Sequence, residues 1–156
     1  MARRRPQGRV ETGERNVTEI VRAAYDAVSR ADLDAVAEVV APDVELIDPD
    51  LPGGGTFRGP EGIRRFVQQW LDAFDELQID IERLVPAGDK VVACLHQQGT
   101  STSGVPVEMR DGHVWTIAGG EATRVELYLT HEAALAAAGA GTWKRERRDS
   151  NPRPPA

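Results

Sequence analysis

Apolar residues recur along most of the chain with two spacings, one typical of helices and one typical of strands. Between residues 18 and 30 they follow helical spacing after Thr18, a residue type that caps helices. Asp32 can cap a shorter second helix, which Pro42 would stop. Pro60 can open a third helix, whose apolar side is formed by Ile63, Phe66, Val67, Trp70, Leu71 and Phe74. The first half therefore predicts three helices, with one strand at residues 44–47.

The second half shows the alternation of strands separated by turn residues. We expect strands at residues 77–85, 90–99, 105–117 and 122–130, with turns at residues 88–89, 100–104 and 119–120. A last helix at residues 132–138 would end at Gly139. Helices followed by hairpin-linked strands predict an α+β fold, in which helices cover one face of a curved antiparallel sheet.

The two ends of the chain differ from its middle. Residues 1–15 and 142–156 lack apolar periodicity and are basic, although the whole chain has a net charge of −6. We predict disordered tails at 1–15 and 142–156 around one domain at 16–141, whose acidity disfavours nucleic acid as a partner. The single cysteine, Cys94, is expected in the core. No apolar run is long enough for a membrane span, so we expect a soluble, cytoplasmic protein without a membrane partner.

Asp48 is the first candidate functional residue, because it follows the strand at residues 44–47 directly. A carboxylate at a strand end can point into a cavity while its backbone stays in the sheet, as a general base requires. The alternative is an acid in a solvated loop. A second candidate surface is one face of the strand at residues 105–117, where alternation aligns Met109, Asp111, His113, Trp115 and Ile117.

Six short motifs occur in an order that is itself informative: Asp32-Leu33-Asp34, Pro42-Asp43-Val44, Asp48-Pro49, Phe57-Arg58-Gly59, Gly62-Ile63 and His113-Val114-Trp115. With the order of elements, they resemble the SnoaL-like branch of the NTF2-like superfamily over about residues 16–140. The resemblance implies a cone, with three N-terminal helices packed on a curved sheet around a pocket. Ketosteroid isomerases, polyketide cyclases and epoxide hydrolases share this cone, and so do non-catalytic modules.

The resemblance also implies roles for particular positions. In the isomerases the general base is the aspartate of an Asp-Pro that ends the first strand, which corresponds to Asp48. The tyrosine of their oxyanion hole would fall on Ala24, with Tyr25 turned about 100° away on an ideal helix. The aspartate of that oxyanion hole would fall on His113. The essential aspartate of the cyclases and hydrolases would fall on Leu127, which argues against their usual chemistry.

These observations suggest a small-molecule isomerase or cyclase that works without a metal or organic cofactor. Asp48 would abstract a proton next to a carbonyl, and His113 would stabilise the oxyanion. The expected substrate-binding residues are Trp70, Met109, Trp115, Val125, Leu127 and Leu129, with Phe57 at the rim.

Alternatives remain at two residues and for the whole protein. His113 could be a structural histidine bonded to a neighbouring backbone group, and Asp111 is expected at a solvated edge of the pocket. The protein could instead be a non-catalytic module that binds a hydrophobic ligand or dimerises. In either case we expect a small hydrophobic molecule as partner and a homodimer formed through the outer face of the sheet.

Overall fold

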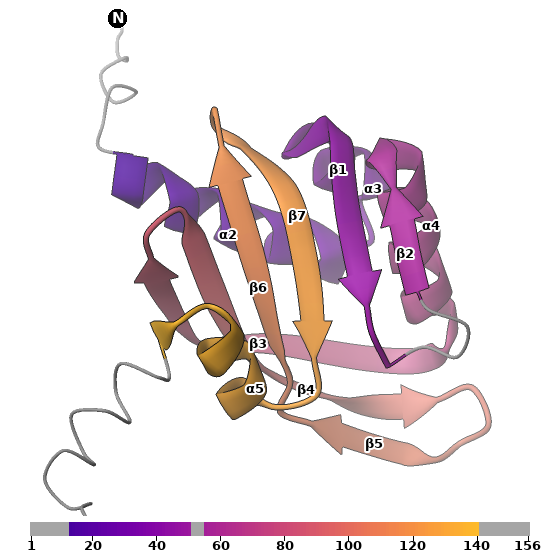
Figure 1. Cartoon of the computed structure of the whole chain (residues 1–156). Helices are drawn as coiled ribbons and strands as arrows, with labels where there is room; N and C mark the ends of the chain where they lie inside the picture. Colours follow the sequence, from indigo (N-terminus) through magenta and orange to yellow (C-terminus); the bar gives the residue numbers. More distant parts are fainter. Residues whose placement is uncertain (1–12, 51–54, 141–156) are drawn as a thin grey trace, which may run out of the picture.

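The computed structural model describes residues 13–50 and 55–140 (Figure 1). The helices are α2 (Gly13–Ser29), α3 (Leu33–Glu38), α4 (Gly59–Asp72) and α5 (His131–Ala137). The strands are β1 (Val40–Asp48), β2 (Gly55–Arg58), β3 (Phe74–Ala87), β4 (Lys90–Ser101), β5 (Pro106–Met109), β6 (Gly112–Ala118) and β7 (Glu121–Tyr128). Residues 1–12 of the first predicted tail and all of the predicted tail at 142–156 lie outside the described residues, whereas residues 13–15 belong to α2.

One curved sheet organises the fold, with the strand order β2-β1-β7-β6-β4-β3 and with β5 paired to β4 (Figure 1). β1 runs parallel to β7, while the remaining strand pairs are antiparallel. The expected α+β arrangement of helices on a curved sheet is confirmed, with a sheet that is mixed because of the β1–β7 pair. None of the described helices combines the length and the hydropathy of a membrane-crossing segment.

The two faces of the sheet are covered by different helices. The N-terminal helices α2, α3 and α4 pack on the concave face, where Val91, Ala93 and Leu95 of β4 join the main core. The intervening Val92 and Cys94 point to the other face, where they pack with α5. Burial on both faces explains why residues 91–95 are all apolar and all buried. It also confirms Cys94 as a core residue.

Several predicted helix boundaries are wrong. α2 begins at Gly13 rather than at Thr18, and α4 ends at Asp72, so that Phe74 starts β3 instead of closing the third helix. Asp32 does cap α3, since its side chain accepts a hydrogen bond from the Ala35 N–H. Pro42, however, lies inside β1, where the pairing with β7 shifts register between Val40 and Glu45. A proline is tolerated there because an irregular stretch needs no regular ladder of N–H donors.

Two strand predictions are also corrected. The sequence did not predict β2, a strand of four residues that pairs with β1. The strand expected at residues 105–117 is divided into β5 and β6 at Arg110 and Asp111. The register against β4 is nevertheless continuous across the break, since Met109 lies opposite Gln97 and Gly112 lies opposite Cys94. The Asp111 carbonyl stays in the sheet by accepting a hydrogen bond from the Leu95 N–H.

Candidate functional site

A cavity of about 450 Å³ lies between the concave face of the sheet and the helices α2, α3 and α4. Its wall is mostly apolar and aromatic, with a small number of polar side chains, as is typical of small-molecule sites. The polar and ionisable side chains on its wall are Tyr25, Asp48, Asp50, Gln69, Gln97, Asp111, His113 and Tyr128. No lysine or arginine from the described part of the chain lines it.

The geometry of the sheet brings three of these polar residues together. Asp111 and His113 are two residues apart and therefore point to the same face, followed on that face by Trp115. Gln97 on β4 lies opposite Met109 on β5, so the Gln97 side chain is the diagonal neighbour of the Asp111 side chain. The concave face thus carries a row of hydrogen-bonding groups that spans two strands.

Asp111 is the centre of this row, and only 8% of its surface is exposed. Gln97 donates from Nε2 to both carboxylate oxygens of Asp111, at 3.1 and 2.9 Å. His113 Nε2 lies 3.1 Å from Asp111 Oδ2. On the other side of Gln97, the indole of Trp70 on α4 donates to its Oε1 at 3.1 Å, which fixes the orientation of the amide.

Tyr25 extends the row from α2. Its hydroxyl oxygen lies 2.6 Å from His113 Nδ1 and accepts a hydrogen bond of 2.9 Å from Trp115 Nε1. The Tyr25 and Trp115 rings meet edge to face, with centroids 5.6 Å apart. We call the connected series Trp70–Gln97–Asp111–His113–Tyr25–Trp115 the polar chain. Each of its members lines the cavity.

The surroundings of the polar chain set the charge of two of its members. Burial alone would raise the pKa of Asp111, but hydrogen bonds from His113 and Gln97, together with the His113 charge, hold that pKa below its usual value. Burial raises the pKa of Tyr25 well above its usual value, although the hydrogen bond from Trp115 opposes the shift. At neutral pH Asp111 is therefore a carboxylate and Tyr25 a neutral phenol.

Most of the predicted site residues lie around this cavity. Asp48 and His113 both line it, as do Trp70, Met109, Trp115, Val125, Leu127 and Leu129. Leu129 is 69% exposed and so lies at the edge of the cavity rather than on its inner wall. Phe57 is not part of the lining, because it packs edge to face on Phe66 with ring centroids 5.3 Å apart.

Two expectations from the sequence are wrong at the polar chain. Asp111 is buried and hydrogen-bonded instead of lying at a solvated edge. Tyr25 does not point away from the site, since it is only 7% exposed and its hydroxyl contacts His113. The described partners of the His113 ring are the side chains of Asp111 and Tyr25, rather than a backbone group. Arg110, the neighbour of Asp111 in the sequence, lies on the outer face of the sheet, where it pairs with Glu82.

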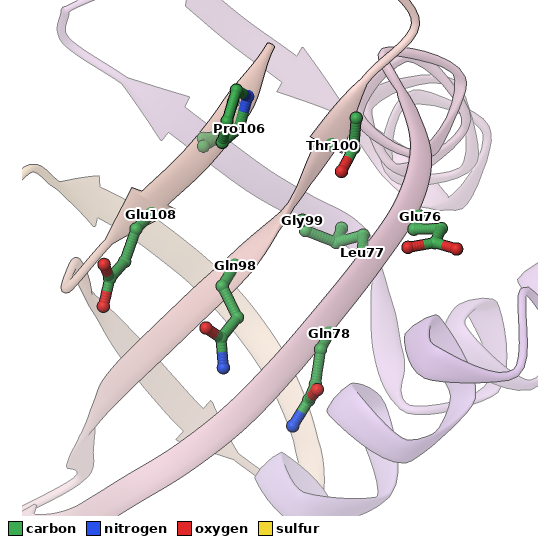
Figure 2. A pocket seen from close by; sticks show the side chains of 9 residues that line it. Glu76, Leu77, Gln78, Gln98, Gly99, Thr100, Pro106 and Glu108 are labelled. Atoms are coloured by element: carbon green, nitrogen blue, oxygen red, sulfur yellow. The ribbon is translucent and has the colours of Figure 1, made fainter. Parts of the chain in front are cut away.

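A second depression lies on the outer face of the sheet, where β3, β4 and β5 run side by side (Figure 2). It is an open groove with the charged side chains of Glu76 and Glu108 at its margins. Gly99 lets the strands approach closely there, since a Cβ on it would lie 2.1 Å from the Glu76 carbonyl oxygen. The groove lacks converging, buried polar groups, so the cavity within the cone is the better candidate site.

The comparison with known proteins agrees with this architecture. The family model described as a SnoaL-like domain matches residues 21–125. The chain belongs to the SnoaL-like family. Within the described residues of this SnoaL-like domain, no group of three or more His, Cys, Asp or Glu side chains is placed to hold a metal ion.

Individual relatives match this chain over most of their own length. An uncharacterised protein of Mycobacterium tuberculosis, Rv0034, is 27% identical over 118 residues, which cover 74% of this chain and 90% of the relative. The crystal structure of an NTF2-like protein of unknown function from Burkholderia pseudomallei matches with a TM-score of 0.67 and 25% identity, covering 78% of this chain and 95% of that one. TerC, co-crystallised with polyporic acid, matches with a TM-score of 0.65 and 26% identity, covering 80% and 98%.

Proposed function

We propose that this SnoaL-like domain binds a small hydrophobic carbonyl compound and catalyses proton transfer at the carbon next to the carbonyl, without a cofactor. Asp48 acts as the general base, and His113 together with Tyr25 stabilises the oxyanion that forms. The observation that supports this most is that Asp48 and His113 line the same cavity from different strands.

The register of the sheet gives the separation between the two groups. His113 lies opposite Leu127 on β7, and Ile47, the residue before Asp48, lies opposite Glu126. Asp48 and His113 are therefore two strands apart at nearly the same height, which corresponds to about 10 Å between their backbones. Both side chains line the cavity, and Leu127 lies on the strand between them. A separation of about 10 Å between the two backbones leaves room for one ring of a substrate between the base and the oxyanion donor.

The position of Asp48 also suits a base. Its Oδ1 accepts a hydrogen bond of 3.1 Å from the Asp50 N–H, which holds the carboxylate at the end of β1. Apolar walls on either side favour a hydrophobic substrate and keep water away from the reacting carbon. TerC, which shares the fold, was crystallised with a small organic molecule, and this supports a small-molecule ligand here.

A second candidate function is ligand binding without turnover. It is favoured by the apolar surface of β7, where Val125 and Leu127 face the cavity and offer no ionisable group. A pure binding protein needs no base, so it predicts that Asp48 can be replaced without a chemical consequence.

Deuterium exchange distinguishes the two functions. The protein is incubated in D₂O with a panel of pocket-sized cyclic ketones that includes 1-tetralone, and loss of the protons next to the carbonyl is followed by NMR. We expect catalysed exchange that Asp48→Asn reduces by at least about a hundredfold, as is usual for removal of a general base. Asp43→Asn, which changes an exposed acid on the same strand, should leave the rate unchanged.

Two results would contradict the catalytic proposal. One is the absence of catalysed exchange with every ketone of the panel, which would leave ligand binding as the function. The other is catalysed exchange that Asp48→Asn does not slow, which would remove Asp48 from the mechanism.

A further inference from the structure

The polar chain ends in two groups that can only donate hydrogen bonds, and this fixes the direction of every bond between them except the one between His113 and Tyr25. The Trp70 indole makes the Gln97 oxygen an acceptor, so the Gln97 amide must donate to Asp111. Asp111 is an ionised acceptor, and His113 must therefore carry a proton on Nε2.

The opposite end is equally constrained. Trp115 donates to the Tyr25 oxygen, which leaves one proton, on the Tyr25 hydroxyl, to be shared with His113 Nδ1. When His113 is neutral, the Tyr25 hydroxyl donates to Nδ1, and no proton is left for a ligand. When His113 is an imidazolium, Nδ1–H donates to the Tyr25 oxygen, and the Tyr25 O–H is released.

The released hydroxyl can turn toward the cavity, which Tyr25 lines, because Trp115 and His113 already occupy two sides of its oxygen. A buried hydroxyl without an acceptor costs about 1–3 kcal/mol. A ligand oxygen that accepts its hydrogen bond removes this cost, so a carbonyl ligand favours the imidazolium form.

We propose that the cavity recognises a neutral carbonyl through the Tyr25 hydroxyl, and that this recognition takes up one proton on His113. This inference rests on the proposed function, because it assigns the group that meets the carbonyl oxygen. Asp111 and Tyr25 are positioned to bind and orient that proton, whereas Asp48 acts at the other end of the ligand.

The charged and titratable groups around His113 agree with one proton being taken up there. Asp111, between β5 and β6, is the nearest carboxylate, and Tyr25 faces His113 from α2. Asp48 and Asp50 reach the same cavity from β1. Cys94 on the neighbouring strand β4 points to the opposite face, into the core under α5. The carboxylates stabilise an imidazolium, and no cation from the described residues lines the cavity to oppose it.

Calorimetry with a matched pair of ligands tests the inference. 1-Tetralone carries the carbonyl, and tetralin has the same two rings without it. At about pH 8, where an ordinary histidine is neutral, tetralone binding measured in buffers of different ionisation enthalpy should take up about one proton, and tetralin binding none. Between about pH 8 and pH 9 the tetralone affinity should fall by up to about tenfold, whereas the tetralin affinity should stay constant.

Three variants separate the roles of the residues. Tyr25→Phe removes the donor and should abolish both the proton uptake and the preference for tetralone over tetralin. His113→Gln can donate but cannot titrate, so its tetralone affinity should not depend on pH. His96→Gln is the matched control, because His96 pairs with Glu108 on the outer face and its loss should leave proton uptake intact.

A measurement on the free protein keeps the test independent of ligand solubility and of variant folding. Nitrogen NMR of wild-type protein should show neutral His113 as the Nε2–H tautomer. The Nδ1–H tautomer, tetralone binding without proton uptake, or tetralone binding no tighter than tetralin would each overturn the inference. Proton uptake without any deuterium exchange would leave the inference standing and overturn only the catalytic step.

Discussion

At the scale of single residues, Gln97 shows how a neutral side chain can define the charge state of a site. It is only 3% exposed, and its amide is oriented by Trp70 so that both of its described hydrogen bonds to Asp111 are donated. These bonds, the hydrogen bond from His113 and the His113 charge together outweigh the effect of burial on the pKa of Asp111. The buried Asp111 side chain can stay ionised because each of its oxygens accepts a hydrogen bond.

The first prediction concerns Gln97→Glu, which places a second carboxylate against Asp111. We expect a loss of about 3 kcal/mol in the free energy of unfolding at neutral pH, since two like charges would be buried together. The deficit should shrink as the pH is lowered and one carboxyl takes up a proton. Urea unfolding at about pH 7 and about pH 5 measures it.

Gln97→Met is the matched control for this prediction. It has a similar length, so it should cost only about 1–3 kcal/mol for the lost hydrogen bonds. Its deficit relative to wild type should not shrink in the way expected for Gln97→Glu. Equal deficits for the two variants at both pH values would show that Gln97 serves only to fill space.

The second prediction concerns Tyr25, whose pKa is raised well above its usual value by burial. A raised pKa in the folded state means that Tyr25 contributes stability below the unfolded-state value of about 10, and that this contribution is lost as the pH rises toward the folded-state value. Above about pH 10 the wild type should lose up to about 1.4 kcal/mol per pH unit from this group.

Tyr25→Phe should remove that alkaline dependence while lowering the stability at neutral pH. The chain has one other tyrosine, Tyr128, whose pKa is raised less strongly, by burial and by Glu126. Tyr128→Phe should therefore retain most of the alkaline loss. Chemical denaturation between about pH 8 and pH 11 measures all three proteins, and an unchanged alkaline slope in Tyr25→Phe would refute the assignment.

At the scale of elements, the sequence predicted best where the periodicity was strong. The helical spacing of apolar residues predicted α4 except for its end, and the continuous apolar run at residues 91–95 predicted β4, whereas the four residues of β2 are too few to show a pattern in the sequence. The sequence did not predict the contact of Tyr25 with the site, because an ideal helical wheel assumes that a helix packs on a flat surface along one side only. The concave sheet wraps around α2, so the consecutive residues Ala24 and Tyr25 are both buried. The burial of Asp111 depends on Gln97 and His113, and local sequence does not show which partners a fold supplies.

Contact between α5 and β6 leads to the third prediction. A Cβ on Gly112 would lie 2.6 Å from the Ala134 Cβ, so Gly112→Ala should destabilise the protein by about 1–3 kcal/mol through overpacking. Ala134→Gly alone should cost about 1 kcal/mol, because glycine weakens a helix. If the contact is the cause, the double variant should be more stable than the sum of the two single effects predicts.

Urea unfolding of the four proteins in this cycle gives the coupling free energy. Strict additivity would mean that the cost of Gly112→Ala arises elsewhere, for example at the Thr130 carbonyl oxygen, which would lie 3.1 Å from the new Cβ. The result also bears on the site, since Gly112 lies between Asp111 and His113 on the chain.

At the scale of the whole molecule, charge restricts the ligand more than shape does. The net charge is −6, and the carboxylates of Asp48, Asp50 and Asp111 reach the cavity without a lining lysine or arginine in the described residues. An anionic ligand would be repelled both on approach and in its final position. A neutral carbonyl compound avoids this repulsion and still accepts the hydrogen bond from Tyr25.

The last prediction follows from this charge distribution and uses two ligands of one shape, 2-acetylnaphthalene and 2-naphthoate. The neutral ketone should bind about ten- to a hundredfold more tightly at neutral pH, as measured by quenching of tryptophan fluorescence, because the carboxylate meets unscreened negative charge. Added salt should narrow the difference, since it screens the field of the whole protein. Asp48→Asn should reduce the difference in affinity between the two ligands further, because it removes one carboxylate at the cavity, whereas Asp43→Asn should have little effect on that difference. Tighter binding of naphthoate than of the ketone would exclude a neutral carbonyl compound as the preferred ligand.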